Sequence, residues 1–179
     1  MKNEKQFLKK NAANFVTLCN MIAGATSILM SLNGKFKTAM AFIILASIAD
    51  RYDGKVARKL NQSSQLGVQM DSMGDVLSFG AAPAILVYTY LFMNLTGPLK
   101  IVGGVGTIFY ICSGAFRLAR FNIEGMDEDN NFYGIPIPVA GLTLVAMMML
   151  KSKIGIIPIA VALFVLGLLM VSKIRIKKK

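Results

Sequence analysis

The sequence predicts an all-α integral membrane protein with six transmembrane helices and an N-terminal segment at the membrane interface. The first supporting observation is that 55% of the 179 residues are hydrophobic, more than a soluble domain of this size can easily bury. The second is a series of long apolar stretches, since a helix needs about 20 apolar residues to cross a bilayer. Residues 1–179 form one expected domain, because no repeat or long linker divides them.

The expected spans follow one another along the whole chain. The first ten residues, MKNEKQFLKK, are basic and only partly apolar, so we expect a retained interfacial segment that leads into the first span. Lys151, Lys153 and Gly155 mark a turn between the last two spans. The six expected spans are 12–31, 36–58, 67–94, 98–121, 137–152 and 153–172.

The distribution of positive charge predicts the orientation of these spans. An even number of spans puts both termini on one side, and that side then carries 15 of the 20 Lys and Arg residues. Cytoplasmic loops are enriched in these residues, so we expect a multi-pass cell-membrane protein with cytoplasmic termini. The net charge of +11 is explained by anchoring to anionic headgroups, and we expect no nucleic-acid partner. The opposite side keeps Lys35, Lys37, Lys100, Lys151 and Lys153.

Several kinds of chemistry are excluded by the composition. The chain has no histidine, which removes the commonest general base and the Ser/His and Cys/His nucleophile systems. Cys19 and Cys112 lie inside apolar spans without zinc-like or disulfide-like spacing, so they are predicted to be packing residues. The stretch 122–135, NIEGMDEDNNFYGI, lacks the spacing of a calcium loop and is predicted to be a solvated loop. Any proton acceptor must therefore be a carboxylate.

Four carboxylates stand apart, because they lie at the ends of the second and third expected spans. They are Asp50, Asp53, Asp71 and Asp75, within DRYDGKVARKLNQSSQLGVQMDSMGD. A carboxylate at such a position is costly and indicates function. On the third span Gly67, Asp71 and Asp75 are spaced by four, so they share one helix face. The connection between the spans is short and polar, which predicts antiparallel neighbours whose acidic faces meet.

The second span presents small residues and a cation beside its carboxylates. At 100° per residue, positions 50, 53, 54, 57 and 58 fall within an arc of about 140°. Gly54 and Ala57 leave room for a substrate, and Arg58 supplies positive charge for a phosphate. Four facing carboxylates would repel one another unless a cation lay between them. Hard oxygen ligands favour Mg²⁺, Mn²⁺ or Ca²⁺, and a pair of such ions would clamp a phosphoryl group.

A simpler interpretation is that these aspartates only form salt bridges with Lys55, Arg58 and Lys59, while the glycines and Ala57 serve packing. The joint spacing on two helices disfavours it. A cation channel or transporter is a second alternative, because intramembrane carboxylates often line ion paths. Arg58 argues against a cation path, and a non-catalytic membrane scaffold would leave the four aspartates unexplained.

The complete spacing of this stretch resembles the signature of the CDP-alcohol phosphatidyltransferase family. Eight residues match over 26 positions: Asp50, Asp53, Gly54, Ala57, Arg58, Gly67, Asp71 and Asp75. The resemblance implies transfer of a phosphatidyl group from a CDP-lipid to an alcohol, with release of CMP. It also implies the membrane-embedded family fold and a homodimer.

The resemblance also implies residue roles. Asp50, Asp53, Asp71 and Asp75 would be ligands of a dimetal site of Mg²⁺ or Mn²⁺, and Asp75 would be the general base. The CDP-lipid would be contacted by residues of the first three spans: Gly54, Ala57, Arg58, Gly67, Asn14 and Thr17. Asn14 and Thr17 also have a simpler interpretation as residues that start a helix.

Three further segments bear on the acceptor alcohol. DSMGDVLSFGAAPA (71–84), RLARFN (117–122) and FYGIPIP (132–138) together resemble the phosphatidylserine synthase branch of the family. L-Serine carries a carboxylate, and the planar fork of arginine suits a carboxylate. The predicted serine-binding residues are Arg117, Arg120, Ser78 and Tyr133, although interface anchoring explains either arginine singly. Glycerol phosphate or inositol phosphate is the alternative acceptor, but either would require a denser basic cluster.

Overall fold

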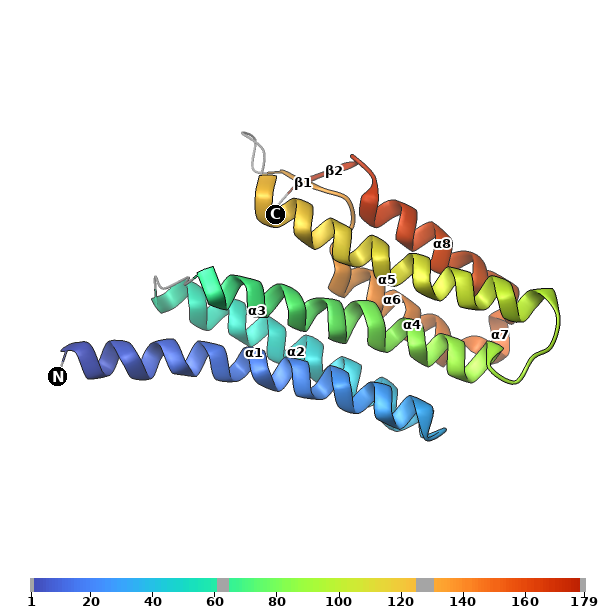
Figure 1. Cartoon of the computed structure of the whole chain (residues 1–179), viewed down its shortest axis with the longest axis horizontal. Helices are drawn as coiled ribbons and strands as arrows, with labels where there is room; N and C mark the ends of the chain where they lie inside the picture. The colour runs from blue at the N-terminus through green and yellow to red at the C-terminus, as the bar shows by residue number, and fades with distance from the viewer. Residues whose placement is uncertain (1, 61–64, 125–130, 178–179) are drawn as a thin grey trace.

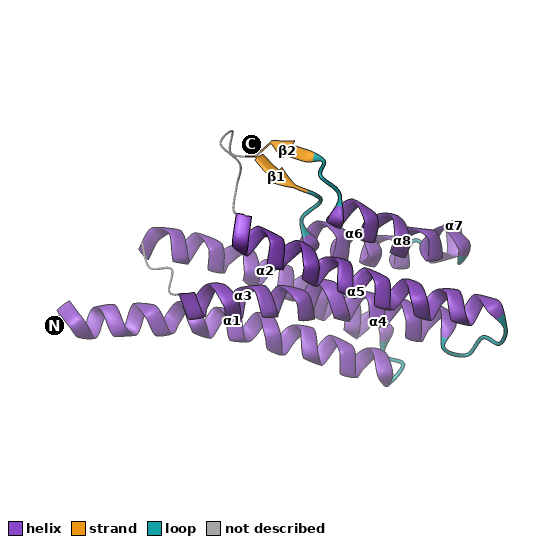
Figure 2. Ribbon diagram, turned by 45° about the horizontal axis from the view of Figure 1, so that its top comes forward, coloured by secondary structure: helices purple, strands orange, loops and turns teal. Residues whose placement is uncertain are grey.

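The computed structural model describes residues 2–60, 65–124 and 131–177, and the side chains within 17–51, 66–124 and 133–175. Within these ranges the chain is almost entirely helical, and the long helices run side by side as a bundle (Figure 1). The only strands in the described part form a short two-stranded ribbon near one end of the bundle (Figure 2).

The first two helices form a hairpin. Helix α1 covers Lys2–Leu32 and α2 covers Phe36–Leu60, and the turn between them contains Gly34 with a φ of 73°. A positive φ is accessible to glycine because it lacks a Cβ. The hydroxyl of Ser27 donates a hydrogen bond of 2.9 Å to the carbonyl of Ala39 and so fastens α1 to α2.

The third rod is continuous but not uniformly α-helical. It passes through α3 (Gln65–Asp75), the π-helical segment η1 (Val76–Ala81), α4 (Ala82–Val87) and a second π-helical segment, η2 (Tyr88–Phe92). Pro83 has no N–H, so the carbonyl of Phe79 loses its usual partner four residues later. The hydroxyl of Tyr110, from α5 (Pro98–Glu124), donates to this carbonyl at 3.1 Å. A wide turn and a neighbouring helix together accommodate the proline.

The remaining elements complete the bundle. After α5 come β1 (Asn131–Tyr133), α6 (Ile137–Met149), the short α7 (Lys151–Ile154), α8 (Ile157–Val171) and β2 (Arg175–Lys177). Strands β1 and β2 pair antiparallel, with Tyr133 opposite Arg175. The predicted turn before α8 is confirmed, since Gly155 has a φ of 79° between α7 and α8.

A stripe of small and polar residues faces the interior along α1. Thr17, Asn20, Gly24, Ser27 and Ser31 are buried and recur every three or four residues. A Cβ on Gly24 would lie 2.8 Å from the Cα of Ser78, so only glycine permits this approach of α1 to η1. Small residues at helix contacts are typical of membrane bundles, where they allow close backbone packing.

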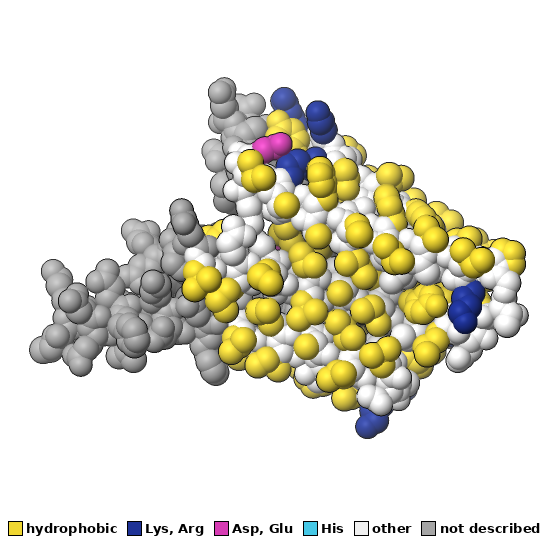
Figure 3. Space-filling view, in the orientation of Figure 1, with side chains coloured by type: hydrophobic (Ala, Val, Ile, Leu, Met, Phe, Trp, Pro, Cys, Tyr) yellow, Lys and Arg dark blue, Asp and Glu magenta, His cyan; other side chains and the backbone are white. Residues whose placement is uncertain are grey.

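The outer surface of the bundle is apolar. On α5, exposed Ile101, Val105, Ile108 and Phe116 recur at helical spacing, and Ile101 is 68% exposed. Figure 3 shows hydrophobic side chains over the long side of the molecule, with the charged side chains of the described residues toward its margins. Such a surface is unfavourable in water and suits contact with lipid.

The helices agree well with the expected spans, although the number of membrane crossings stays a prediction. Two described helices are long and apolar enough to cross a bilayer, Leu66–Phe92 and Pro98–Glu124. Shorter apolar helices cover Thr17–Leu32, Ile137–Met149 and Ile157–Val171. The expected interfacial segment is continuous with the first span, as the beginning of α1. The solvated loop expected at 122–135 is partly wrong, because α5 continues to Glu124 and Asn131–Tyr133 forms β1, while 125–130 lie outside the described residues.

Candidate active site

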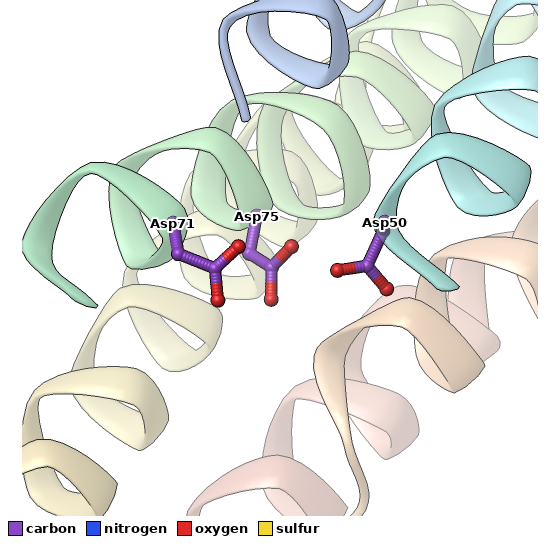
Figure 4. A group of neighbouring side chains, drawn as sticks. All are labelled: Asp50, Asp71 and Asp75. Carbon is purple, nitrogen blue, oxygen red and sulfur yellow. The ribbon is translucent and has the colours of Figure 1, made fainter. Parts of the chain in front are cut away.

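Three of the four predicted metal ligands meet where α2 and α3 face each other. Asp50 lies on α2, whereas Asp71 and Asp75 lie one turn apart on α3 (Figure 4). One carboxylate oxygen from each residue lies within 4.8 Å of the other two. The spacing of four along α3 places both of its carboxylates on the side that faces Asp50. The sequence prediction of meeting acidic faces is confirmed for these three residues.

Asp75 is the most enclosed member of this acidic cluster. Its Oδ1 atom is shielded from solvent and has no hydrogen-bond partner among the described residues. Asp50 and Asp71 interact unfavourably with its charge, whereas Arg117 interacts favourably. A buried carboxylate oxygen without a hydrogen-bond partner is costly. The arrangement therefore provides an oxygen ligand, or a proton acceptor, that the protein itself does not satisfy.

Asn20 lies beside the acidic cluster, although the sequence pattern did not single it out. It lies on α1 with 1% of its side chain exposed, and its Nδ2 and Oδ1 make no hydrogen bond of good geometry with the described residues. The amide is nevertheless close enough to Asp75 to interact favourably with its charge. A Cβ on Gly74 would lie 3.5 Å from Nδ2, so the amide sits against α3 beside Asp75. The signal was present in the sequence, since Asn20 lies one turn after Thr17 within an apolar span.

Arg117 approaches the same place from α5. Its side chain is 7% exposed, and its Nε is buried without a hydrogen-bond partner in the described part of the chain. The guanidinium carbon lies 5.4 Å from the ring centre of Phe121, one turn along α5, which helps to orient the side chain. A buried guanidinium beside a carboxylate cluster provides a directed cation. Membrane-interface anchoring does not explain this burial.

Arg120, the second arginine of RLARFN, forms hydrogen bonds with the backbone. Its guanidinium donates to the carbonyls of Val171 at 2.9 Å, Ser172 at 3.2 Å and Tyr133 at 3.2 Å. These bonds hold the end of α8 against β1. They indicate a structural role, so the predicted contact of Arg120 with serine loses support and stays a prediction. Tyr133 takes part in the same fastening through its carbonyl, so its assignment to the serine pocket loses support.

Gly134, next in the chain, also serves this junction. Its φ is 73°, and an added Cβ would overlap the carbonyl oxygen of Met170. The FYGIPIP segment thus connects β1, α6 and the end of α8.

Ser78 and Asn122 likewise hold helices together. Ser78 is fully buried, and its hydroxyl donates to the carbonyl of Asn20 at 2.8 Å, so its predicted contact with serine loses support and stays a prediction. Asn122 Nδ2 donates to the hydroxyl of Ser72 at 2.9 Å and thereby ties α5 to α3 beside Asp71. Within RLARFN, Arg117 faces the site, while Arg120 and Asn122 fix the helices around it.

Other predicted donor-contact residues are placed only in part. Thr17 is buried on α1 one turn before Asn20, and Gly67 is half-buried on α3 one turn before Asp71. Both remain compatible with the predicted cleft. The side chains of five predicted residues lie outside the described ranges: Asn14, Asp53, Gly54, Ala57 and Arg58.

The described residues fit a divalent cation of the hard type. Three carboxylates from two helices can each offer an oxygen, and the buried Oδ1 of Asp75 has no other partner among the described residues. Mg²⁺ and Mn²⁺ prefer such oxygen donors, whereas the chain has no histidine to offer a softer metal. Asp50, Asp71 and Asp75 are therefore the residues that could hold the ion.

Comparison with known proteins gives a consistent result. The family model for CDP-alcohol phosphatidyltransferase matches residues 10–171. A CDP-diacylglycerol–serine O-phosphatidyltransferase of Methanocaldococcus jannaschii is 38% identical over 93% of this chain and 73% of its own length. The Bacillus subtilis protein of that name is 36% identical over 89% of this chain and 86% of its own length.

A third relative, archaetidylserine synthase of Methanothermobacter thermautotrophicus, is 37% identical over 80% of this chain and 60% of its own length. The family match covers the acidic cluster, Asn20 and Arg117, as well as the junction around Gly134. The chain therefore belongs to the CDP-alcohol phosphatidyltransferase family.

Proposed function

We propose that this protein transfers a phosphatidyl group from a CDP-lipid to the hydroxyl of L-serine, releasing CMP, in phospholipid biosynthesis. The observation that carries the proposal is the meeting of Asp50, Asp71 and Asp75 in a chain of this family. The names of its relatives support serine as the acceptor. The relatives differ in the lipid that they name, so the proposal covers diacylglycerol and ether-linked donors.

On the donor side, the acidic cluster would hold Mg²⁺ or Mn²⁺ through Asp50, Asp71 and Asp75, with Asp53 as the fourth predicted ligand. When bound, the metal supplies positive charge beside the diphosphate. Thr17 and Gly67 lie one turn from Asn20 and Asp71, on the helices that flank the cluster. We assign them, with Asn14, Gly54, Ala57 and Arg58, to the contact with the CDP-lipid. Small residues there leave space for the nucleotide against the helices.

On the acceptor side, Asp75 takes the proton from the serine hydroxyl. The serine oxygen forms a bond to the lipid-bearing phosphorus, and the bond from that phosphorus to the oxygen of CMP breaks. CMP leaves with the bonding electron pair. Because no histidine is present and the motif contains no cysteine, a carboxylate remains the available base for direct attack.

Arg117 and Asn20 are assigned to the recognition of serine. The buried guanidinium can bind the carboxylate of serine, and the amide of Asn20 can accept from its ammonium or hydroxyl group. A site built with buried polar groups discriminates strongly against a ligand that leaves them unpaired. Among the described side chains, Arg117 is the cation that acts on Asp75, and one arginine falls short of the dense basic cluster that a phosphate-bearing alcohol would require.

At the level of the whole protein, we propose a single domain that crosses the membrane six times. The termini and the acidic cluster would face the cytoplasm, where CDP-lipid and serine are available. A homodimer is also expected. The apolar surface supports placement in lipid, and the basic residues near both ends of the chain support this orientation.

The direct test uses the purified protein with a CDP-lipid and Mn²⁺ or Mg²⁺, and CMP release is measured with each acceptor in turn. We expect CMP with L-serine, little CMP with glycerol phosphate or inositol phosphate, and none when the metal is chelated. CMP release only with a phosphate-bearing alcohol would reassign the acceptor. No CMP with any acceptor would favour the transporter alternative.

A further inference from the structure

A cavity lies far from the acidic cluster, at the other end of α2. It has a volume of about 830 Å³ and is lined by the turn before α2, the first turns of α2, Tyr90, and the end of α6 with the start of α7. At 1.5 Å per residue, Lys35 and Asp50 are separated by roughly 20 Å along α2. The α1–α2 turn and α7 lie at the same end of the molecule (Figure 1).

The rim of this cavity is basic. Lys35, Lys37 and Lys151 all line it, and Lys35 and Lys37 are exposed. They are three of the five lysines that the charge distribution assigns to the non-cytoplasmic side. That side is usually poor in positive charge, so simple topology does not explain why lysines gather at one cavity.

The wall of the cavity is apolar and includes contacts between aromatic side chains. The rings of Phe36 and Tyr90 lie 4.4 Å apart, and Lys151 Nζ lies 4.1 Å from the ring centre of Tyr90. Ile44 extends the apolar wall along α2 and is 39% exposed. The cavity thus combines cations at one end with an open hydrocarbon surface at the other. A lipid headgroup and its acyl chains have the same arrangement of charge and apolar surface.

We propose that this basic cavity binds one anionic phospholipid, with its phosphate among Lys35, Lys37 and Lys151 and its acyl chains along Phe36, Tyr90 and Ile44. Charge complementarity selects an anionic headgroup over a zwitterionic one. The cavity size lies within the range of ordinary ligand sites. This site is separate from the acidic cluster and does not depend on the proposed reaction.

The test is native mass spectrometry of the full chain in detergent with added dioleoyl phosphatidylglycerol or dioleoyl phosphatidylcholine. The variant Lys35→Gln/Lys37→Gln removes two exposed charges at the cavity. The control Lys100→Gln/Lys153→Gln removes two exposed charges at the same end, outside the cavity. Both variants keep the acidic cluster, so lipid bound at that cluster adds the same signal to the mass spectra of both.

We expect wild-type protein and the control to retain phosphatidylglycerol, and the cavity variant to retain roughly tenfold less. A third variant, Ala41→Trp, fills the cavity without changing charge and should also lower retention. Equal loss in both double variants, or equal retention of phosphatidylcholine, would overturn the proposal. Displacement of the lipid by free inorganic phosphate would also overturn it, because the site would then bind phosphate alone. A dimer mass in place of the lipid adduct in wild type, lost in the cavity variant, would overturn it too, because a second copy of the chain would then occupy the cavity.

Discussion

At the scale of single residues, the two arginines of RLARFN have separate roles despite their similar setting in sequence. Arg117 is buried beside Asp75 with its Nε unpartnered in the described structure, whereas Arg120 donates to three backbone carbonyls. The sequence alone predicts a serine contact for both arginines, because they lie three residues apart near the end of one helix. Only the packing of α8 and β1 distinguishes them.

This difference predicts that substitutions of Arg117 and Arg120 affect different properties, serine binding in the first case and stability in the second. Arg117→Lys keeps the charge but loses the planar fork, so the KM for serine should rise about tenfold while CDP-lipid binding stays unchanged. Arg120→Gln should lower the free energy of unfolding by about 1–3 kcal/mol, because it removes hydrogen bonds to three partly buried carbonyls, and leave the serine KM unchanged. Steady-state kinetics and thermal unfolding of both variants separate the two effects. A raised serine KM in Arg120→Gln alone would reverse the assignments.

At the scale of the elements, the third rod depends on a hydrogen bond from Tyr110 of α5 to the carbonyl of Phe79, four residues before Pro83. The Tyr110 hydroxyl supplies the hydrogen bond to the Phe79 carbonyl that Pro83 cannot supply. Tyr110→Phe alone should therefore destabilise the protein by about 1–3 kcal/mol, since it leaves a buried carbonyl without this donor.

Because Pro83→Ala restores a backbone N–H, Tyr110→Phe should cost less in that background. A double-mutant cycle measured by unfolding should give a coupling energy of about 1 kcal/mol between the two positions. Purely additive effects would show that the tyrosine does not compensate for the proline.

The positions of most helices could be predicted from the sequence. Apolar stretches located the helices, and glycine marked the turn at Gly155. The π-helical segments, the β1–β2 ribbon and the Arg120 junction could not be predicted in this way. They depend on contacts between residues far apart in the chain, such as the pairing of Tyr133 with Arg175. Local propensity carries no signal for a three-residue strand of this kind.

The acidic cluster, in contrast, could be predicted, because its residues lie close together in the sequence. Asp50, Asp71 and Asp75 lie on adjacent helices joined by a short connection, so helical periodicity alone brings them together. Asn20 comes from a more distant part of the chain, and only the close packing of α1 on Gly74 places its amide at the site.

At the scale of the whole molecule, the orientation in the membrane is the feature that links the two sites. In the proposed orientation, Glu124, near the acidic-cluster end, would face the cytoplasm and Lys153 the other side of the membrane. In a background without Cys19 and Cys112, Glu124→Cys and Lys153→Cys should react with a membrane-impermeant thiol reagent from opposite faces of sealed cells or inverted vesicles. Labelling of both from one face would contradict the proposed orientation.

The central claim is that the acidic cluster performs the transfer to serine, and Asp75→Asn tests it most directly. The substitution keeps the size of the side chain but removes the proton acceptor and a metal ligand, so serine-dependent CMP release should fall by about 10²–10⁴-fold or more. Glu124→Gln, a matched change at an exposed carboxylate, should keep wild-type turnover. Near-normal CMP release by a folded Asp75→Asn protein would contradict the account.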